Sequence, residues 1–265
     1  MIQLLFTLTF IVWITLTGPW DWFGIYFRYL WLIIAMPVIY ISWKRVRSLP
    51  FRTKLTRSGK FSRGINIVLF LVFALYTISA FNGMTVKEEA IELSFPLKNG
   101  TYYVGQGGST TQMNYHNSYE PQSYAIDIVK LNYFGARADD IYPDDLEKYE
   151  IFGDILYCPC NGTVLETRDH LKDLTPPDSN PDQPEGNYLA IQCDGNDATL
   201  YIAHMKEGSI TVAENDSVAE GYPIGLVGNS GNTTEPHLHI HVEKDGIGIP
   251  IRFDGNFLVR NNIVK

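Results

Sequence analysis

Apolar residues follow two different patterns along this chain of 265 residues. In the first third they form three long runs, at residues 2–17, 25–43 and 65–81. A membrane-spanning helix needs about 20 mostly apolar residues. The runs therefore predict three spans, of which the first is the shortest and is diluted by threonines. From Leu93 onward the apolar runs are short, and Gly, Asn, Asp and Pro separate them.

Charge gives these predicted spans an orientation. Residues 44–63, between the second and third runs, hold eight Lys and Arg residues and no acidic residue. Because loops rich in Lys and Arg stay on the cytoplasmic side, we predict a cytoplasmic N-terminus, a basic cytoplasmic loop at 44–63 against the lipid bilayer, and an extracytoplasmic remainder. A signal peptide is the alternative for the first run, but that run lacks a basic start and a small-residue cleavage site.

This pattern divides the chain into a multi-pass membrane anchor at 1–84, a linker at 85–92 and an exported domain at 93–265. The anchor holds nine basic residues and one acidic residue, whereas the remainder holds 12 basic and 28 acidic residues. A nucleic-acid-binding domain needs clustered basic surface. The acidic exported domain therefore excludes nucleic acid as a partner.

The exported part reads as an all-β domain, an antiparallel sheet or sandwich. Short runs rich in β-branched and aromatic residues, bounded by turn residues, predict strands at 124–129, 163–167, 188–192, 200–204 and 237–242. Two polar segments, residues 132–149 and 169–186, break this rhythm and predict surface loops, the second at the edge of a site.

Three of the six histidines alternate along one predicted strand, at His237, His239 and His241. Alternate residues of a strand project from one face, and imidazole is the commonest metal ligand and general base in proteins. Asp127 lies between two isoleucines of another predicted strand. A carboxylate is costly to bury unless it is paired or binds a metal, although Asp127 on a solvent-facing side of its strand is an open alternative. These residues indicate a candidate metal site.

A resemblance assigns roles to some of these residues. Residues 228–231 (Gly-Asn-Ser-Gly) and 236–239 (Pro-His-Leu-His) resemble the glycine-rich turn and the histidine motif of the lysostaphin-like, LytM-type zinc endopeptidases. Those enzymes cleave peptide bonds in bacterial cell-wall peptidoglycan. The resemblance implies that His239 binds zinc and that His237 is catalytic. Residues 201–204 resemble the family's strand ending in Ala-His, which implies that His204 is the second catalytic histidine.

The family's other two zinc ligands match His116 and Asp127, so the resemblance implies one Zn²⁺ ion held by His116, Asp127 and His239. The usual aspartate follows its histidine by four residues, whereas here the step is eleven. Residues 114–123 must then form an excursion that returns the chain to the metal. His241 and Asn229 are expected to support the ligands or catalytic histidines without binding the metal, and His170 is expected at the surface.

Cysteine adds little to this picture. Cys158, Cys160 and Cys193 are too few for a disulfide framework. An extracytoplasmic location permits a disulfide, and Cys193 can pair with either of the other two. We expect small residues in or near a core, with at most one bridge.

Together these features favour a membrane-anchored zinc metalloendopeptidase that acts on peptidoglycan peptides. One alternative is a non-catalytic LytM-like regulator of another wall hydrolase, a class that usually loses metal ligands. Here all five matched positions are occupied by the family's residue types. A second alternative is a zinc peptidase that acts on an exported protein or peptide.

Overall fold

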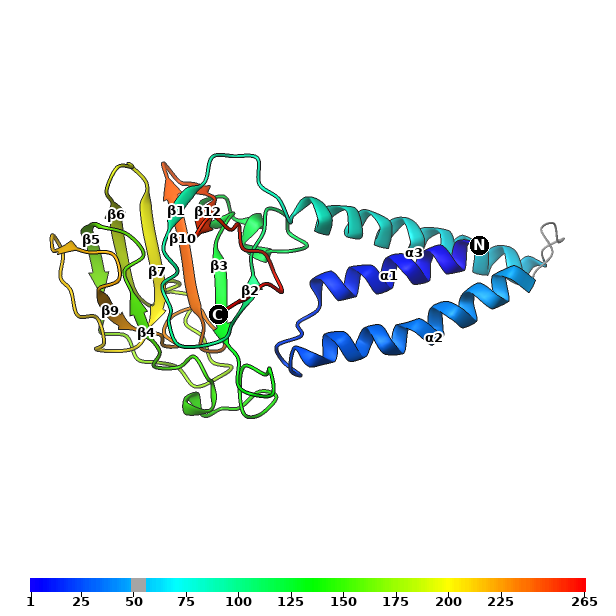
Figure 1. Ribbon diagram of the computed structural model, residues 1–265, viewed down its shortest axis with the longest axis horizontal. Helices are drawn as coiled ribbons and strands as arrows, with labels where there is room; N and C mark the ends of the chain where they lie inside the picture. Colours follow the sequence, from blue (N-terminus) through cyan, green and yellow to red (C-terminus); the bar gives the residue numbers. More distant parts are fainter. Residues whose placement is uncertain (49–55) are drawn as a thin grey trace.

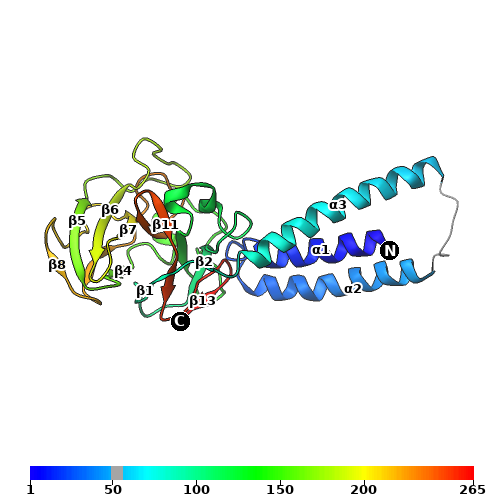
Figure 2. The same ribbon diagram turned by 90° about the horizontal axis from the view of Figure 1, so that it is seen from above.

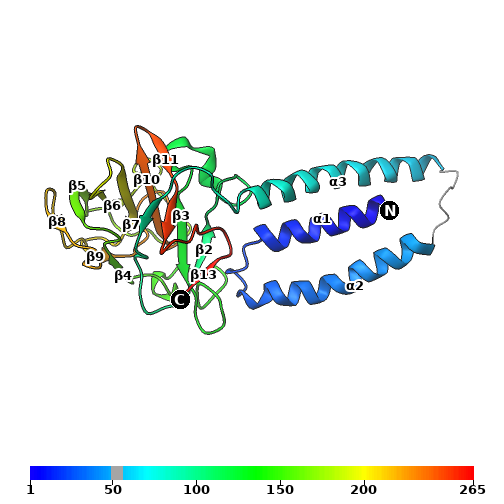
Figure 3. The same ribbon diagram turned by 45° about the horizontal axis from the view of Figure 1, so that its top comes forward.

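The computed structural model describes residues 1–48 and 56–265. Three helices, α1 (Ile2–Thr17), α2 (Tyr26–Ser48) and α3 (Arg57–Asn82), extend from one end of a β-domain (Figure 1). Helix α1 lies between the other two (Figures 2 and 3). Within the described ranges, α2 and α3 are long and apolar enough to cross a membrane, whereas α1 is a shorter apolar helix.

The number of spans is therefore a correction to the sequence prediction, which had three. Helix α1 has 16 residues. At 1.5 Å per residue it is about 24 Å long, which is less than the ~30 Å thickness of a bilayer's hydrocarbon core. Its N-terminus lies short of the far ends of α2 and α3 (Figure 1).

The predicted basic loop at 44–63 is partly helical. Helix α2 continues through Lys44, Arg45 and Arg47, and α3 already begins at Arg57. Lys and Arg are good helix formers, so α2 and α3 extend beyond the apolar runs that predicted them. Thr56 caps α3 by accepting a hydrogen bond from the Gly59 amide at 3.1 Å. The remainder of the predicted loop, residues 49–55, lies outside the described residues.

The β-domain is built around one antiparallel sheet with the order β13-β2-β3-β10-β7-β6-β5-β8, with β11 paired to β10. This confirms the predicted all-β class and the main predicted strands. The strands of this sheet are β2 (Tyr102–Gln106), β3 (Ile126–Lys130), β5 (Gly162–Arg168), β6 (Asn187–Cys193), β7 (Thr199–Met205), β8 (Ser217–Val218), β10 (Leu238–Lys244), β11 (Ile247–Ile249) and β13 (Ile263–Val264).

Two small pairs of strands complete the domain. Strand β1 (Ile91–Leu93) pairs in parallel with β12 (Ile251–Phe253), and β4 (Ile155–Tyr157) pairs with β9 (Pro223–Leu226). Strand β1 begins inside the stretch that was predicted as a linker. A disulfide joins Cys160 to Cys193, while Cys158 is free and buried.

One face of the sheet packs the hydrophobic core. On β10, Leu238, Ile240 and Val242 point into this core and are almost completely buried. The alternate residues His239 and His241 therefore lie on the opposite face, as the period-two pattern predicts. Strand β10 begins one residue after His237, so this histidine precedes the strand instead of starting it.

The helices and the β-domain are in direct contact. The Arg260 guanidinium donates a hydrogen bond from Nη1 to the Thr17 carbonyl at 2.9 Å, and Asn261 Nδ2 donates to the Leu16 carbonyl at 2.6 Å. The segment 132–149, predicted to be a surface loop, is hydrogen-bonded to the α1–α2 connection through its backbone. Its Arg137 is only 1% exposed. This prediction was wrong for Arg137 because its partners lie far away in sequence.

Candidate metal centre and active site

The three central strands of the sheet bring the candidate ligands together. In the register of the sheet, His239 on β10 lies opposite Asp127 on β3 and opposite Ala203 on β7. Residues directly opposite each other in an antiparallel pair project from the same face. The His239 Nδ1 atom is consequently 2.9 Å from Asp127 Oδ1, and both side chains are buried.

His116 reaches the same carboxylate through the long step in the sequence. Two short 3₁₀ helices, η1 (Tyr115–Ser118) and η2 (Glu120–Gln122), take up the extra residues before β3 begins. The Asn114 side chain fixes this excursion, because it accepts from the His116 amide at 3.2 Å and donates to the Ala125 carbonyl at 2.9 Å. His116 Nε2 then lies 2.9 Å from Asp127 Oδ2.

The donor chemistry of this cluster fits a metal ion. One ligand atom each from His116, Asp127 and His239 lies within 4.8 Å of the others. Burial by itself raises the pKa of Asp127, but the charges of His116 and His237 and the hydrogen bonds from His116 and His239 hold that pKa well below its usual range. Burial lowers the pKa of His239. One carboxylate with two imidazoles is a donor set that zinc sites use.

His241 supports His239 from the side away from Asp127. The His239 Nε2 atom is 3.0 Å from His241 Nδ1, and the His241 ring stacks on Tyr201 with 4.9 Å between ring centroids and 9° between planes. In the tautomer that binds a metal through Nδ1, the His239 proton is on Nε2 and can be donated to His241 Nδ1. Second hydrogen bonds of this kind fix the tautomer and orientation of ligating histidines.

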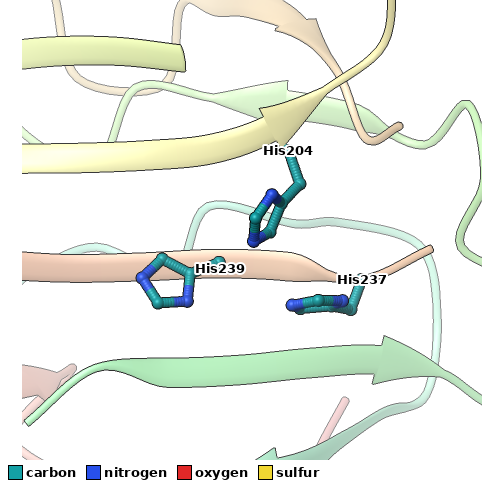
Figure 4. A group of neighbouring side chains, drawn as sticks. All are labelled: His204, His237 and His239. Atoms are coloured by element: carbon teal, nitrogen blue, oxygen red, sulfur yellow. The ribbon is translucent and has the colours of Figure 1, made fainter. Parts of the chain in front are cut away.

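His204 and His237 approach this cluster from two different elements, as Figure 4 shows with His239 beside them. Their ring centroids are 5.0 Å apart. His204 Nδ1 lies 2.9 Å from the Ser230 carbonyl, and His237 Nδ1 lies 2.9 Å from the Glu235 carbonyl. A carbonyl only accepts, so each Nδ1 carries the proton and each Nε2 keeps a lone pair.

The two histidines differ in burial and backbone. Burial lowers the pKa of His204 well below its ordinary value. His204 also has a φ of 58°, a left-handed conformation that non-glycine residues rarely adopt and that recurs at functional sites. His237 is partly exposed, and its Nε2 is 3.6 Å from Asp127 Oδ1.

The loop 228–236 supports both histidines. The buried Asn229 accepts a hydrogen bond from Thr233 Oγ1 at 3.1 Å, and Thr233 Oγ1 lies 3.2 Å from His237 Nδ1. Near His204, the Ser230 carbonyl packs against Gly186, where an added Cβ would be only 2.2 Å from that oxygen. Gly186 has a φ of 63°, so both its conformation and the close approach require glycine.

Two cavities flank the cluster. One of 210 Å³ opens beside His116, His204 and Glu185, and one of 370 Å³ opens beside Asp127 and His237. Tyr115 lines both, and its ring lies 4.0 Å from the His116 ring. Burial and the Asp127 carboxylate raise the pKa of Tyr115, so its hydroxyl stays protonated beside the cluster.

Some residues of the site were not found from the sequence. Tyr115 gave no signal except its position next to His116. Trp22 and Glu235, which line the second cavity, and Arg137, which contacts both, were not predicted as site residues, although Glu235 immediately precedes the Pro-His motif. His170 is exposed, as expected.

A mostly antiparallel β-domain with a buried histidine and aspartate cluster on its sheet defines a candidate metallopeptidase. Residues 152–250 match Peptidase family M23. The match covers less than half of the chain, and it confirms the predicted resemblance to the LytM-type and lysostaphin-type peptidases. The matched segment includes His204, His237 and His239, and it begins after His116 and Asp127.

Among curated proteins, the chain is similar to the peptidoglycan DD-endopeptidase ShyA of Vibrio cholerae serotype O1. The two are 34% identical over 87 residues, which is 33% of this chain and 17% of that relative. A solved zinc-containing peptidase from Vibrio cholerae is 21% identical, covers 61% of this chain and 39% of its own, and has a TM-score of 0.38. Lysostaphin from Staphylococcus simulans is 15% identical, with 60% and 47% coverage and a TM-score of 0.30.

Proposed function

We propose that this protein is a membrane-anchored zinc metalloendopeptidase that hydrolyses peptide bonds in cell-wall peptidoglycan. The observation that carries the proposal is one convergence of side chains. The ligand atoms of His116, Asp127 and His239 lie within 4.8 Å of one another, and His204 and His237 stand beside them with both Nδ1 atoms hydrogen-bonded to backbone carbonyls. The complete set favours an enzyme over a non-catalytic regulator, a class that usually loses metal ligands.

The three buried ligands would hold one Zn²⁺ ion. When bound, zinc supplies an activated water and polarises a carbonyl oxygen. The chain's own part is to fix the donors before the metal arrives. His116 Nε2 and His239 Nδ1 each lie 2.9 Å from an Asp127 carboxylate oxygen, so the three donor atoms already face one another.

The two remaining histidines move protons. Because each Nδ1–H donates to a carbonyl, each Nε2 is free to take a proton from water and to return it to the leaving amine. One histidine acts as this base and acid. The other donates from its protonated ring to the oxyanion of the tetrahedral intermediate. Burial lowers the pKa of His204, which leaves its Nε2 unprotonated before reaction but makes it a weaker base than a free imidazole.

Location and substrate complete the proposal. The basic ends of α2 and α3 support a cytoplasmic location for the distal helix ends by the positive-inside rule, and with it an extracytoplasmic β-domain. The Cys160–Cys193 disulfide supports an oxidising compartment. The DD-endopeptidase name of the ShyA relative supports cross-linked stem peptides containing D-amino acids as the substrate class.

The proposal is tested on the full-length protein in detergent micelles. We expect about one bound zinc ion per chain and release of peptides from purified peptidoglycan. His239→Ala and His116→Ala should each lower kcat/KM on the order of 10³-fold, because several kcal/mol of metal-dependent stabilisation are lost. The exposed His170→Ala is the matched control and should behave as the wild type.

Other outcomes separate the alternatives. Zinc-free wild-type protein, or full activity in both ligand variants, would contradict the metalloenzyme proposal. Bound zinc with cleavage of a supplied linear peptide but not of peptidoglycan would assign the activity to an exported protein or peptide. Bound zinc without any cleavage, together with stimulation of a second wall hydrolase, would assign the regulator role.

A further inference from the structure

The 370 Å³ cavity beside His237 has a wall that the peptidase domain does not supply. Pro19, Asp21 and Trp22, from the connection between α1 and α2, line it together with Asp127 and His237. The cavity is thus bounded by the membrane anchor on one side and by the candidate catalytic residues on the other. Trp22 is 36% exposed, so part of its ring remains available to a ligand.

A buried arginine holds this wall in place. The Arg137 guanidinium lies 4.3 Å from the centre of the Trp22 ring, and the Arg137 amide donates to the Asp21 carbonyl at 3.2 Å. Trp22 also stacks on Tyr142 at 5.4 Å, with 21° between the ring planes. A cation over a tryptophan face is attractive, and more so when it is desolvated. The position of Trp22 is therefore fixed from two sides.

The same arginine reaches the catalytic side of the cavity. Arg137 Nε donates to Glu235 Oε2 at 2.7 Å, and the Glu235 carbonyl accepts from His237 Nδ1 at 2.9 Å. Tyr142, the stacking partner of Trp22, donates its hydroxyl to the Thr234 carbonyl at 2.9 Å. The anchor wall and the segment that carries His237 are therefore positioned by shared residues.

The helix ends on either side of this wall are fixed to the β-domain. At the end of α1, Arg260 and Asn261 donate to the carbonyls of Thr17 and Leu16. Before α2, the Ile25 amide donates to the Gly135 carbonyl at 2.7 Å. A wall that is tied at both ends forms a defined surface for a ligand, because it costs little entropy to order on binding.

We propose that the α1–α2 connection is a wall of the substrate cleft, and that the substrate segment on one side of the scissile bond lies in the 370 Å³ cavity against Trp22. This inference rests on the proposed function. The segment that fits is a short peptide stretch with an apolar group over the Trp22 ring, since Pro19, Trp22 and Val129 give this cavity apolar lining. The peptide is then cut next to the membrane surface, where α1 and α2 meet.

The test uses the full-length zinc-loaded protein in detergent and three substrates. One is a cross-linked stem-peptide dimer, and the other two are dimers shortened on one or the other side of the scissile bond. We expect Trp22→Ala to raise KM for the full dimer about tenfold, the worth of one aromatic contact, with kcat within about threefold of the wild-type value. The difference in KM between Trp22→Ala and the wild type should vanish for the dimer that lacks the segment in the cavity and persist for the other shortened dimer.

Phe23→Ala is the matched control, because Phe23 is in the same connection, is 58% exposed and does not line the cavity. It should leave KM unchanged. Trp22→Phe keeps a ring and should recover most of the lost affinity. The inference is overturned if Trp22→Ala leaves KM unchanged, or if it impairs all three substrates equally, as a general loss of structure would.

The failure of the proposed function has a different signature. If the wild type cleaves none of the dimers, equilibrium binding of the full dimer to wild-type and Trp22→Ala protein tests the cavity by itself. A dissociation constant about tenfold weaker in the variant supports the anchor wall. Equal dissociation constants overturn it.

Discussion

The two cavities beside the metal cluster are built from different parts of the molecule. The 210 Å³ cavity at His204 is lined entirely by the β-domain, by residues between 115 and 239. The 370 Å³ cavity at His237 adds residues 19, 21 and 22 of the connection between α1 and α2, the part proposed as a membrane anchor. A peptide that crosses the cluster would therefore meet the peptidase domain on one side and the anchor on the other.

The segment that matches the M23 family contains residues of the His204 side but not the residues that distinguish the His237 side. Residues 152–250 supply both candidate catalytic histidines, yet Trp22, Asp21 and Arg137 lie outside the matched segment. The candidate catalytic histidines and His239 thus lie within the segment that matches the M23 family. The structure on the His237 side depends on segments that the family match does not contain.

The two sides also differ in buried charge. His204 is held by a neutral carbonyl of Ser230. On the other side, Arg137 lies between two carboxylates, with 2.6 Å from Nη2 to Glu235 Oε2 and 4.0 Å from Nε to Asp21 Oδ2. Buried charges are tolerated only when they are paired. We therefore expect charge substitutions to affect the anchor side far more than the His204 side.

The largest effect is expected for Arg137→Met. This change keeps much of the side-chain volume but leaves the Glu235 and Asp21 carboxylates without their counter-charge. Removing one partner of a buried ion pair typically costs about 3–5 kcal/mol. The free energy of unfolding of the β-domain, measured by denaturant titration of the full chain in detergent, should fall by about that amount.

The double variant Arg137→Met/Glu235→Gln is the control for this interpretation. It removes the uncompensated Glu235 charge, so it should regain a large part of the lost stability. A change below about 1 kcal/mol in Arg137→Met would mean that the charged network adds no stability, and the contrast between the two sides would then be one of shape alone.

A somewhat smaller effect is expected from Asp21 and depends on pH. Burial raises the pKa of Asp21 to about 6, with Arg137 and Arg260 opposing and Glu235 reinforcing the shift. The folded state thus binds a proton more tightly than the unfolded state, whose value is 3.8. The stabilisation is complete below the unfolded pKa and is lost as the pH rises through the folded pKa, a fall of about 3 kcal/mol.

Asp21→Asn should lack this fall, because an amide does not titrate. The difference in unfolding free energy between the variant and the wild type should shift by about 2–3 kcal/mol in favour of the variant between about pH 4 and about pH 7. The exposed Asp178→Asn should parallel the wild type. Parallel curves for Asp21→Asn and the wild type would show that Asp21 is not buried in a charged state.

These predictions concern the part of the molecule that the sequence revealed least. Strands β5, β6, β7 and β10 were predictable because each is a short run rich in apolar, β-branched and aromatic residues, with turn residues between the runs. The pairing of Asp127 with His239 became a strong expectation only through the Pro-His-Leu-His motif. Local sequence patterns therefore predicted the strands of the sheet, and the motif predicted the cluster of His239 and Asp127.

The other features of the site could not be predicted, because they depend on contacts between residues far apart in the sequence or on local backbone geometry. Arg137 and Asp21 are 116 positions apart, and neither residue has a periodic neighbour that indicates burial. The excursion at residues 114–123 ends in 3₁₀ turns held by Asn114, which a count of spacing does not reveal. Helix α1 is too short to be counted as a span, which lowered the number of spans from the three expected. An apolar run in the sequence shows that a segment is hydrophobic, but it does not show that the helix is long enough to cross a membrane.

The smallest effect is expected on the side away from the anchor, at His241. His241→Phe keeps a ring to stack on Tyr201 but removes the acceptor for His239 Nε2–H. Loss of such a hydrogen bond behind a metal ligand typically weakens metal binding 10–100-fold, or about 1.4–2.8 kcal/mol. Competition with a chelator should measure a zinc affinity lower by this factor.

His241→Asn tests the cause, because its side-chain oxygen can accept where Nδ1 did, and it should bind zinc more tightly than His241→Phe. Unchanged affinity in His241→Phe would contradict a supporting role for His241. His241 and Trp22 share no partner, so their effects should add when the two substitutions are combined. Free-energy effects that are clearly not additive would contradict the distinction between the two sides. They would mean that the anchor wall and the far side of the metal centre are energetically coupled.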